Sequence, residues 1–206
     1  MFCFIRFDEA FSGYYTKGLE ELVEDNIQYA EIRALLIPVY DAYGNTNTDP
    51  ENTLNIYKSI NEKFLASHSN DFYGSRIIYI GSRSANTSAV AKSIDKAIYL
   101  RNKYPELLAG FDLVGQEDPG HSLLYFVNQL LVPRSTGADL PYFFHAGETD
   151  WEGRAVDYNL ADALLLDTKR VGHGFAFVKH PHLMEVAAKK GVSAEVCPLS
   201  NQVSSA

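Results

Sequence analysis

Short apolar segments alternate with amphipathic segments along this chain, and that alternation is the strongest constraint on its fold. Strands are expected in six segments rich in Val, Ile, Leu, Tyr and Phe: residues 27–36, 76–80, 107–114, 141–145, 170–172 and 191–197. Several are apolar nearly throughout, as is typical of parallel strands covered on both faces. Their spacing of roughly 30 residues indicates βαβ units and a parallel sheet.

Helical patterns fill most of the intervals between these strands. Helices are expected over residues 15–25, 86–103, 123–131, 156–166 and 182–190. Asp49-Pro50 marks a further helix start, because proline suits the first helical turn. Residues 42–52 are polar and predict a longer loop. Since no linker or low-complexity tract interrupts the pattern, we expect one domain over residues 1–206.

Polar residues close or follow each expected strand. These positions are the carboxyl ends of the strands, which a parallel sheet presents along one edge. In chain order they are Glu31 and Arg33, Ser82 and Arg83, residues 115–118, His145 and Glu148, residues 172–174, and residues 198–201. A (β/α) barrel gathers such residues on one face. A doubly wound open sheet is the alternative, with its ligand at one switch point. We favour the barrel, because no glycine-rich phosphate fingerprint follows the first strand.

The charge and the apolar content exclude several classes of partner. A net charge of −8 and a pI of about 5.2 argue against nucleic acid or an anionic membrane. No apolar stretch approaches the roughly 18 residues of a membrane span. Residues 1–7 are apolar but too short for a signal-peptide core. Cys3 and Cys197 form no CxxC motif, so no zinc-ribbon or redox motif is present.

Three of these polar residues suit metal-assisted hydrolysis. His145 can bind a divalent metal, and Glu148 can pass protons beside it. His173 lies between two glycines, which leave its imidazole unobstructed to steer a water. For each residue the alternative is a hydrogen-bonded turn at a strand end, and the other four histidines are expected on the surface. Neither a G-x-S-x-G elbow nor the H-x-E and P-C-x-x-C deaminase signature occurs.

Four ordered motifs resemble those of the adenosine deaminase family: residues 110–115, 145–148, 172–174 and 195–201. The run 143–151 resembles the family's secreted branch, the adenosine deaminase-related growth factors. This resemblance extends from about residue 19 to the last residue. It implies hydrolytic deamination of adenosine to inosine and ammonia on a (β/α) barrel with one Zn²⁺. It also implies an adenosine-like small-molecule substrate, an extracellular location and a possible homodimer.

The resemblance assigns roles to five residues. His145 resembles a zinc ligand, and Glu148 the acid that protonates a purine ring nitrogen. His173 resembles the base that orients the attacking water. Gly115 resembles the glycine whose backbone meets the purine, and Glu31 a carboxylate that contacts substrate. A protonated carboxyl in a desolvated pocket is a competent acid at neutral pH.

The chain also departs from the family pattern. The family's first barrel strand carries a His-x-His pair and its last an Asp-Asp pair, and neither occurs here. The resemblance therefore implies a partial TIM barrel, strands two to seven of eight, with two open edges and three of four zinc ligands missing. We expect negligible zinc affinity in this chain, because one histidine cannot hold the ion. The alternative function is a catalytically inactive, truncated relative that acts as a binding or growth-factor-like protein.

Two further departures bear on the substrate. Ser82 stands where the secreted branch tends to have a histidine, and residues 42–53 lack its tryptophan. Deamination of another purine substrate is therefore a third hypothesis.

Overall fold

The structure, a computed structural model, describes residues 5–204 and has a strand in each of the six expected segments. The strands are β1 (Tyr29–Ala34), β2 (Gly74–Ser82), β3 (Leu108–Val114), β4 (His145–Ala146), β5 (Arg170–His173) and β6 (Ser193–Glu195). The helices are α2 (Asp8–Glu24), α3 (Pro50–Ser67), α4 (Thr87–Lys103), α5 (Val127–Leu130), α6 (Val132–Thr136), α7 (Asn159–Leu165), α8 (Pro181–Lys190) and α9 (Pro198–Ser204), with 3-10 turns η1 (Leu124–Phe126) and η2 (Phe175–Lys179). None of the helices within residues 5–204 is both long and apolar enough to cross a membrane.

The strands pair in the order in which they occur along the chain. β1, β2 and β3 form one sheet in that order, and β4, β5 and β6 form another. An isolated parallel bridge between Phe111 and Tyr142 connects β3 to the segment before β4. The parallel pairs β4–β5 and β5–β6 continue the series. This order has no reversal of the kind that creates a switch point in a doubly wound sheet, and it is that of a partial (β/α) barrel.

The segment expected as a strand over residues 141–145 is only partly one. Regular pairing covers His145–Ala146 alone. Upstream, Phe111 donates its amide to the Pro141 carbonyl at 2.9 Å, and Phe143 donates to the Phe111 carbonyl at 3.0 Å. Pro141 has no amide hydrogen and cannot extend the ladder. The fourth strand is therefore shorter than the apolar run that predicts it.

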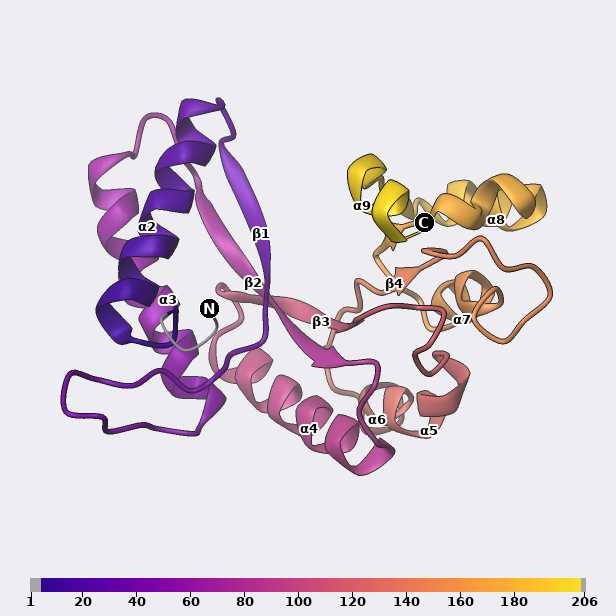
Figure 1. The fold of residues 1–206 in the computed structure, drawn as a ribbon, viewed down its shortest axis with the longest axis horizontal. Helices are drawn as coiled ribbons and strands as arrows, with labels where there is room; N and C mark the ends of the chain where they lie inside the picture. The colour runs from indigo at the N-terminus through magenta and orange to yellow at the C-terminus, as the bar shows by residue number, and fades with distance from the viewer. Residues whose placement is uncertain (1–4, 205–206) are drawn as a thin grey trace. The chain divides into compact units, whose positions relative to one another are not determined.

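The chain divides into two compact units, an N-terminal unit of residues 1–77 and 106–108 and a second unit of residues 78–105 and 109–206. In the N-terminal unit, α2 and α3 pack side by side (Figure 1). Their shared core contains Tyr15, Leu19, Ile60, Phe64 and Phe72. The expected helix start is confirmed: Asp49 accepts a hydrogen bond from the Glu51 amide at 2.9 Å, and Pro50 lies in the first turn.

The second unit is built around β3. Every residue of β3 before Val114 is buried, as expected for a parallel strand covered on both faces. Helix α4 begins with Asn86 as its cap, since the Asn86 side chain accepts from the Ala89 amide at 2.9 Å. The buried face of α4 consists of Val90, Ile94, Ala97 and Leu100. The spacing of these four residues is the amphipathic pattern that predicts the helix.

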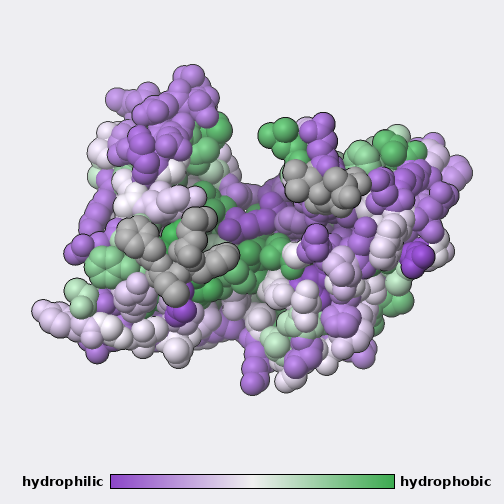
Figure 2. All heavy atoms as spheres, in the orientation of Figure 1, coloured by the Kyte–Doolittle hydropathy of each residue, from purple (hydrophilic) through white to green (hydrophobic). Residues whose placement is uncertain are grey.

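Apolar side chains are exposed at the C-terminal end of the described chain. Val196 and Leu199 are 71% and 78% exposed. Met184 on α8 is also about half exposed, and Figure 2 shows hydrophobic residues on the surface over α8 and α9. In the part of the chain that the structure describes, β6 pairs with β5 only. The open edge expected from the sequence is present here.

A buried polar triad stabilises the N-terminal unit. Tyr15 donates its hydroxyl to Asn61 Oδ1 at 2.8 Å, and the Ser75 hydroxyl donates to the same oxygen at 2.8 Å. The Asn61 amide donates to the Ser75 carbonyl at 3.3 Å. Burial raises the pKa of Tyr15, so its hydroxyl remains a neutral donor. The triad satisfies polar groups that the helix core would otherwise leave unpaired.

We predict that Asn61→Ala lowers the free energy of unfolding by about 2 kcal/mol, because two buried hydroxyls lose a shared acceptor. The matched control is Asn55→Ala, an exposed asparagine on the same helix, with an expected change below about 0.5 kcal/mol. Urea denaturation of both variants measures the difference. Equal stabilities would contradict a role for the triad.

Candidate functional site

His145 is held at the beginning of β4 by a buried carboxylate. Asp112 on β3 is fully buried, and its Oδ2 lies 2.6 Å from Nδ1 of His145. Asp112 Oδ1 accepts the backbone amides of His145 at 2.9 Å and Leu113 at 2.7 Å. Because a carboxylate only accepts, Nδ1 of His145 carries a hydrogen. In the neutral ring the lone pair is then on Nε2, as it is in histidines that bind metals.

The pairing of β4 with β5 sets the neighbours of this imidazole. His145 lies opposite Gly172, and Ala146 lies opposite His173. A Cβ at Gly172 would come within 3.2 Å of Nδ1 of His145, a tight contact to which that ring would have to adjust. The glycine before His173 therefore leaves space for the His145 ring, a role that the sequence did not predict.

His173 is buried and has a left-handed backbone conformation. Its φ is +66°, and its side chain is 6% exposed. Nδ1 lies 2.6 Å from the Asn201 amide oxygen, which accepts its hydrogen. Nε2 then faces Glu148, with 3.6 Å between Nε2 and Oε2. A positive φ is uncommon outside glycine, and such positions cluster at functional sites.

Glu148 completes a group of three side chains from two neighbouring strand ends. Its carboxyl is 11% exposed and accepts a hydrogen bond from the Ser200 hydroxyl at 3.4 Å. The rings of His145 and His173 have centroids 5.1 Å apart. The structure thus brings together the three residues that the sequence predicts as metal ligand, acid and base. An acid and a base this close suit proton transfer to and from one bound molecule.

Gly115 and Glu31 are the other two residues predicted from the sequence. Gly115 directly follows β3, is exposed and has φ of +118°. A Cβ there would meet only Arg83 Cβ, at 3.9 Å, so its conformation rather than crowding favours glycine. Glu31 lies on β1 in the N-terminal unit and accepts the Tyr29 hydroxyl at 3.1 Å. Their contacts with substrate remain predictions.

Sequence reasoning gave no role to Asp112 and Asn201, the residues that orient the two imidazoles. Asp112 is the one charged residue in the apolar run of β3, and a charge inside a buried strand needs a partner. Asn201 was noted only as one of the polar residues after the sixth strand. The expectation that His180 is a plain surface residue is wrong. Its ring is 24% exposed, with Nε2 lying 2.6 Å from the buried Asp157 carboxylate.

The fit to a metal ion is partial. His145 presents Nε2 as one nitrogen ligand, with the carboxylate partner on Nδ1 that metal-binding histidines usually have. Across residues 5–204, no three His, Cys, Asp or Glu side chains come together as a metal-binding group. A zinc site takes three or four protein ligands. The described residues therefore do not make a complete zinc site.

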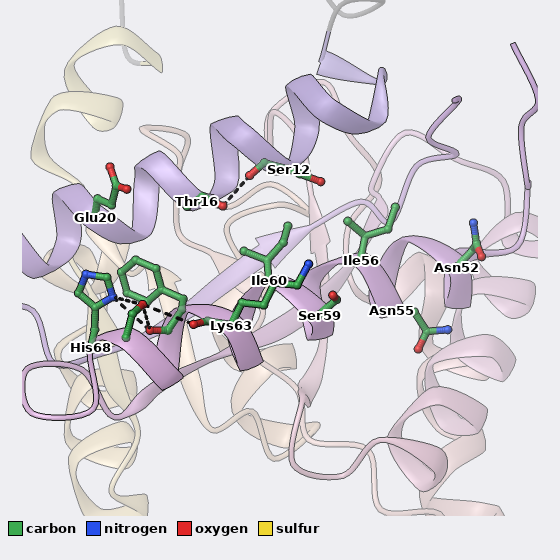
Figure 3. Close-up of a pocket in the computed structure, with 12 residues that line it drawn as sticks. Ser12, Thr16, Glu20, Asn52, Asn55, Ile56, Ser59, Ile60, Lys63 and His68 are labelled. Carbon is green, nitrogen blue, oxygen red and sulfur yellow. Dashed lines mark hydrogen bonds between the residues drawn. The ribbon is translucent and has the colours of Figure 1, made fainter. Parts of the chain in front are cut away.

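A separate open groove lies between α2 and α3, with a volume of about 570 Å³ (Figure 3). Ser12, Thr16 and Glu20 line one side, and residues from Asn52 to His68 line the other. None of the residues predicted from the sequence as site residues lines it. This groove is thus distinct from the predicted site.

The model of one protein family, described as adenosine deaminase, matches residues 4–206. Adenosine deaminase 2 of Homo sapiens is 47% identical over 199 residues, which are 97% of this chain and 39% of the relative's length. The structure is similar to Arabidopsis ADAL complexed with IMP, with a TM-score of 0.68 and 17% identity over 96% of this chain and 54% of that one. It is also similar to an amidohydrolase from Burkholderia ambifaria with bound Zn, with a TM-score of 0.68 and 19% identity over 96% and 50%.

These likenesses support the fold and the family separately. The family model, which matches nearly the whole chain, shows the family, whereas the solved structures are distant in sequence and show the fold alone. The chain spans about 39% of the length of the curated relative from Homo sapiens.

We predict that Asp112→Asn reverses the tautomer of His145. Asp112 Oδ1 accepts two backbone amides, so the new carboxamide must keep its oxygen there and turn its NH₂ toward Nδ1. Nδ1 then has to accept, which moves the ring hydrogen to Nε2. Two-bond ¹H–¹⁵N spectra of the imidazoles measure this change.

His180 provides the internal control for that experiment, because Asp157 already binds its Nε2. Its spectrum should stay in the Nε2–H form in both proteins. A His145 ring that keeps its hydrogen on Nδ1 in the variant would contradict the assigned geometry.

Proposed function

The chain belongs to the adenosine deaminase family, and we propose that in the complete protein its site performs the hydrolytic deamination of adenosine to inosine and ammonia. The observation that carries the proposal is the 3.6 Å approach of Glu148 Oε2 to His173 Nε2, beside the oriented His145. Both groups are nearly excluded from water, where proton transfers to a bound substrate are most effective.

Each of the two residues handles a proton. Glu148, in its protonated form, donates to a purine ring nitrogen, which leaves the adjacent amino-bearing carbon electron-poor. His173 Nε2 accepts a proton from the water that attacks this carbon. The C–N bond to the amino group then breaks, and ammonia leaves with the proton that His173 returns to it. The hydroxyl on the same carbon becomes the carbonyl of inosine, and its proton restores the acid form of Glu148. The sum is adenosine plus water giving inosine plus ammonia.

We further propose one zinc ion in the complete protein, with Nε2 of His145 as one of its ligands. Zinc in such sites lowers the pKa of bound water to about 7. The family and the zinc-containing amidohydrolase of the same fold support a metal. The described residues hold no group of three or more His, Cys, Asp or Glu side chains that could bind a metal, so the proposal needs further ligands.

In this proposal, Gly115 and Glu31 contact the substrate. Gly115 has an exposed backbone after β3, which suits an approach to a planar base. The ligand of the Arabidopsis structure, IMP, is a purine nucleotide and supports a small-molecule substrate of this class. The extracellular location and the homodimer remain predictions of the family resemblance.

We predict that Glu148→Gln, made in the protein expressed from its complete transcript, lowers kcat for ammonia release from adenosine by about 10²–10⁴-fold. The glutamine keeps the shape of the side chain but has no acidic proton to give. The matched control is Glu152→Gln, an exposed carboxylate four residues away, which should leave kcat unchanged. A variant at position 148 with more than about a tenth of the normal rate would exclude Glu148 as the acid.

A further inference from the structure

Arg83 and Glu117 are buried charged residues that the proposed mechanism does not use. Arg83 directly follows β2, and Glu117 lies in the turn after β3. Their side chains are 0% and 1% exposed. Nη1 of Arg83 and Oε1 of Glu117 are 4.0 Å apart, too far for a direct hydrogen bond. The two charges neutralise each other, while Nη1 and Nη2 of Arg83 and both oxygens of Glu117 hydrogen-bond to other groups.

Both side chains bond to the backbone of residues 145–148. Nη2 of Arg83 donates to the His145 carbonyl at 2.6 Å. Glu117 accepts the Gly147 amide on Oε1 at 3.1 Å and the Glu148 amide on Oε2 at 2.7 Å. This one charge pair therefore binds three of the four residues in segment 145–148. The same segment carries both the predicted metal ligand and the predicted acid.

Neighbouring groups hold the pair in place. The Asn159 side chain donates to Glu117 Oε1 at 2.6 Å and accepts the Leu123 amide at 2.7 Å. Nη1 of Arg83 donates to the His121 carbonyl at 3.4 Å. A Cβ at Gly120 would lie 2.7 Å from Cδ of Arg83, so the turn closes tightly over the guanidinium. Neither side chain has room to reorient.

We propose that Arg83 and Glu117 form a loop clamp whose function is to position the Glu148 carboxyl against His173. Two charges are costly to bury, and a buried pair is retained where its hydrogen bonds set a geometry. Charge-assisted bonds to backbone groups are among the strongest available for holding a loop. Arg83 and Glu117 are positioning residues, and their role in catalysis rests on the proposed function.

The test is Glu117→Gln in the protein expressed from its complete transcript. Both Glu117 oxygens accept from N–H groups, so the NH₂ of glutamine must face a donor in either orientation. Exchange of the Gly147 and Glu148 amides with deuterium should become at least about tenfold faster. For adenosine, kcat should fall about 100-fold and KM change less than about threefold, because a displaced acid impairs chemistry more than binding.

Arg101→Gln is the matched control. It removes another ion pair of an arginine, the 2.9 Å contact of Arg101 with Asp139, which lies shortly before residues 141–145 in the chain. It should alter neither the exchange at Gly147 and Glu148 nor kcat. Asn159→Ala is the second variant for the case that Glu117→Gln does not fold. Of the bonds to Glu117 it removes the one to Oε1, together with the bond from the Leu123 amide, and a smaller change in the same direction is expected.

Equal exchange of the Gly147 and Glu148 amides in the wild type and in either variant would overturn the loop clamp. A fall in kcat that only follows the loss of folded protein, measured by thermal unfolding, would overturn it as well. Amide hydrogen exchange is measured in the absence of substrate and metal. A wild-type protein that releases no ammonia from adenosine would refute the proposed function, while the exchange data would still decide the role of the clamp.

Discussion

The parallel register of β4 on β5 is the constraint on which the rest of the site depends. It sets His145 opposite Gly172 and the next residue opposite His173. Residues paired in register share a face and successive residues alternate, so His145 and His173 would point to opposite faces of a regular sheet. Regular alternation ends at His173, whose backbone is left-handed, and the two rings have centroids 5.1 Å apart. A Cβ at Gly172 would lie 3.2 Å from Nδ1 of His145, so a larger residue there would require that ring to shift.

Two different acceptors orient the two imidazoles, and the difference matches their proposed roles. A carboxylate, Asp112, binds Nδ1 of the predicted metal ligand, where negative charge strengthens Nε2 as a donor to a cation. A neutral amide, Asn201, binds Nδ1 of the predicted base. The amide directs the ring of His173 without adding charge beside Glu148. Asp112 lies within β3 and Asn201 on α9, just after β6, so each partner comes from an element beside the strand end that carries its histidine.

Much of this arrangement could be predicted from the sequence, because each strand is an apolar run that ends in a polar residue. The six strands and the trio His145, Glu148 and His173 follow from that pattern. The short length of β4 does not, since the apolar run continues through residues that make only one bridge. The partners of the histidines were missed for a different reason. A hydrogen bond between β3 and β4 depends on register, which one sequence does not show.

The chain spans about 39% of the length of the relative from Homo sapiens, and no group of three or more His, Cys, Asp or Glu side chains that could hold a metal is found among the described residues. What these residues do bring together is the predicted acid, Glu148, and the predicted base, His173, with the buried groups that bond to them.

The most direct test is a crystal structure of the protein, expressed from its complete transcript, with a purine ribonucleoside bound. The account predicts a Glu148 carboxyl oxygen within about 3 Å of a purine ring nitrogen, with Nε2 of His173 directed at the position of the attacking water. A purine bound elsewhere, or a Glu148 side chain turned away from the ring, would contradict it.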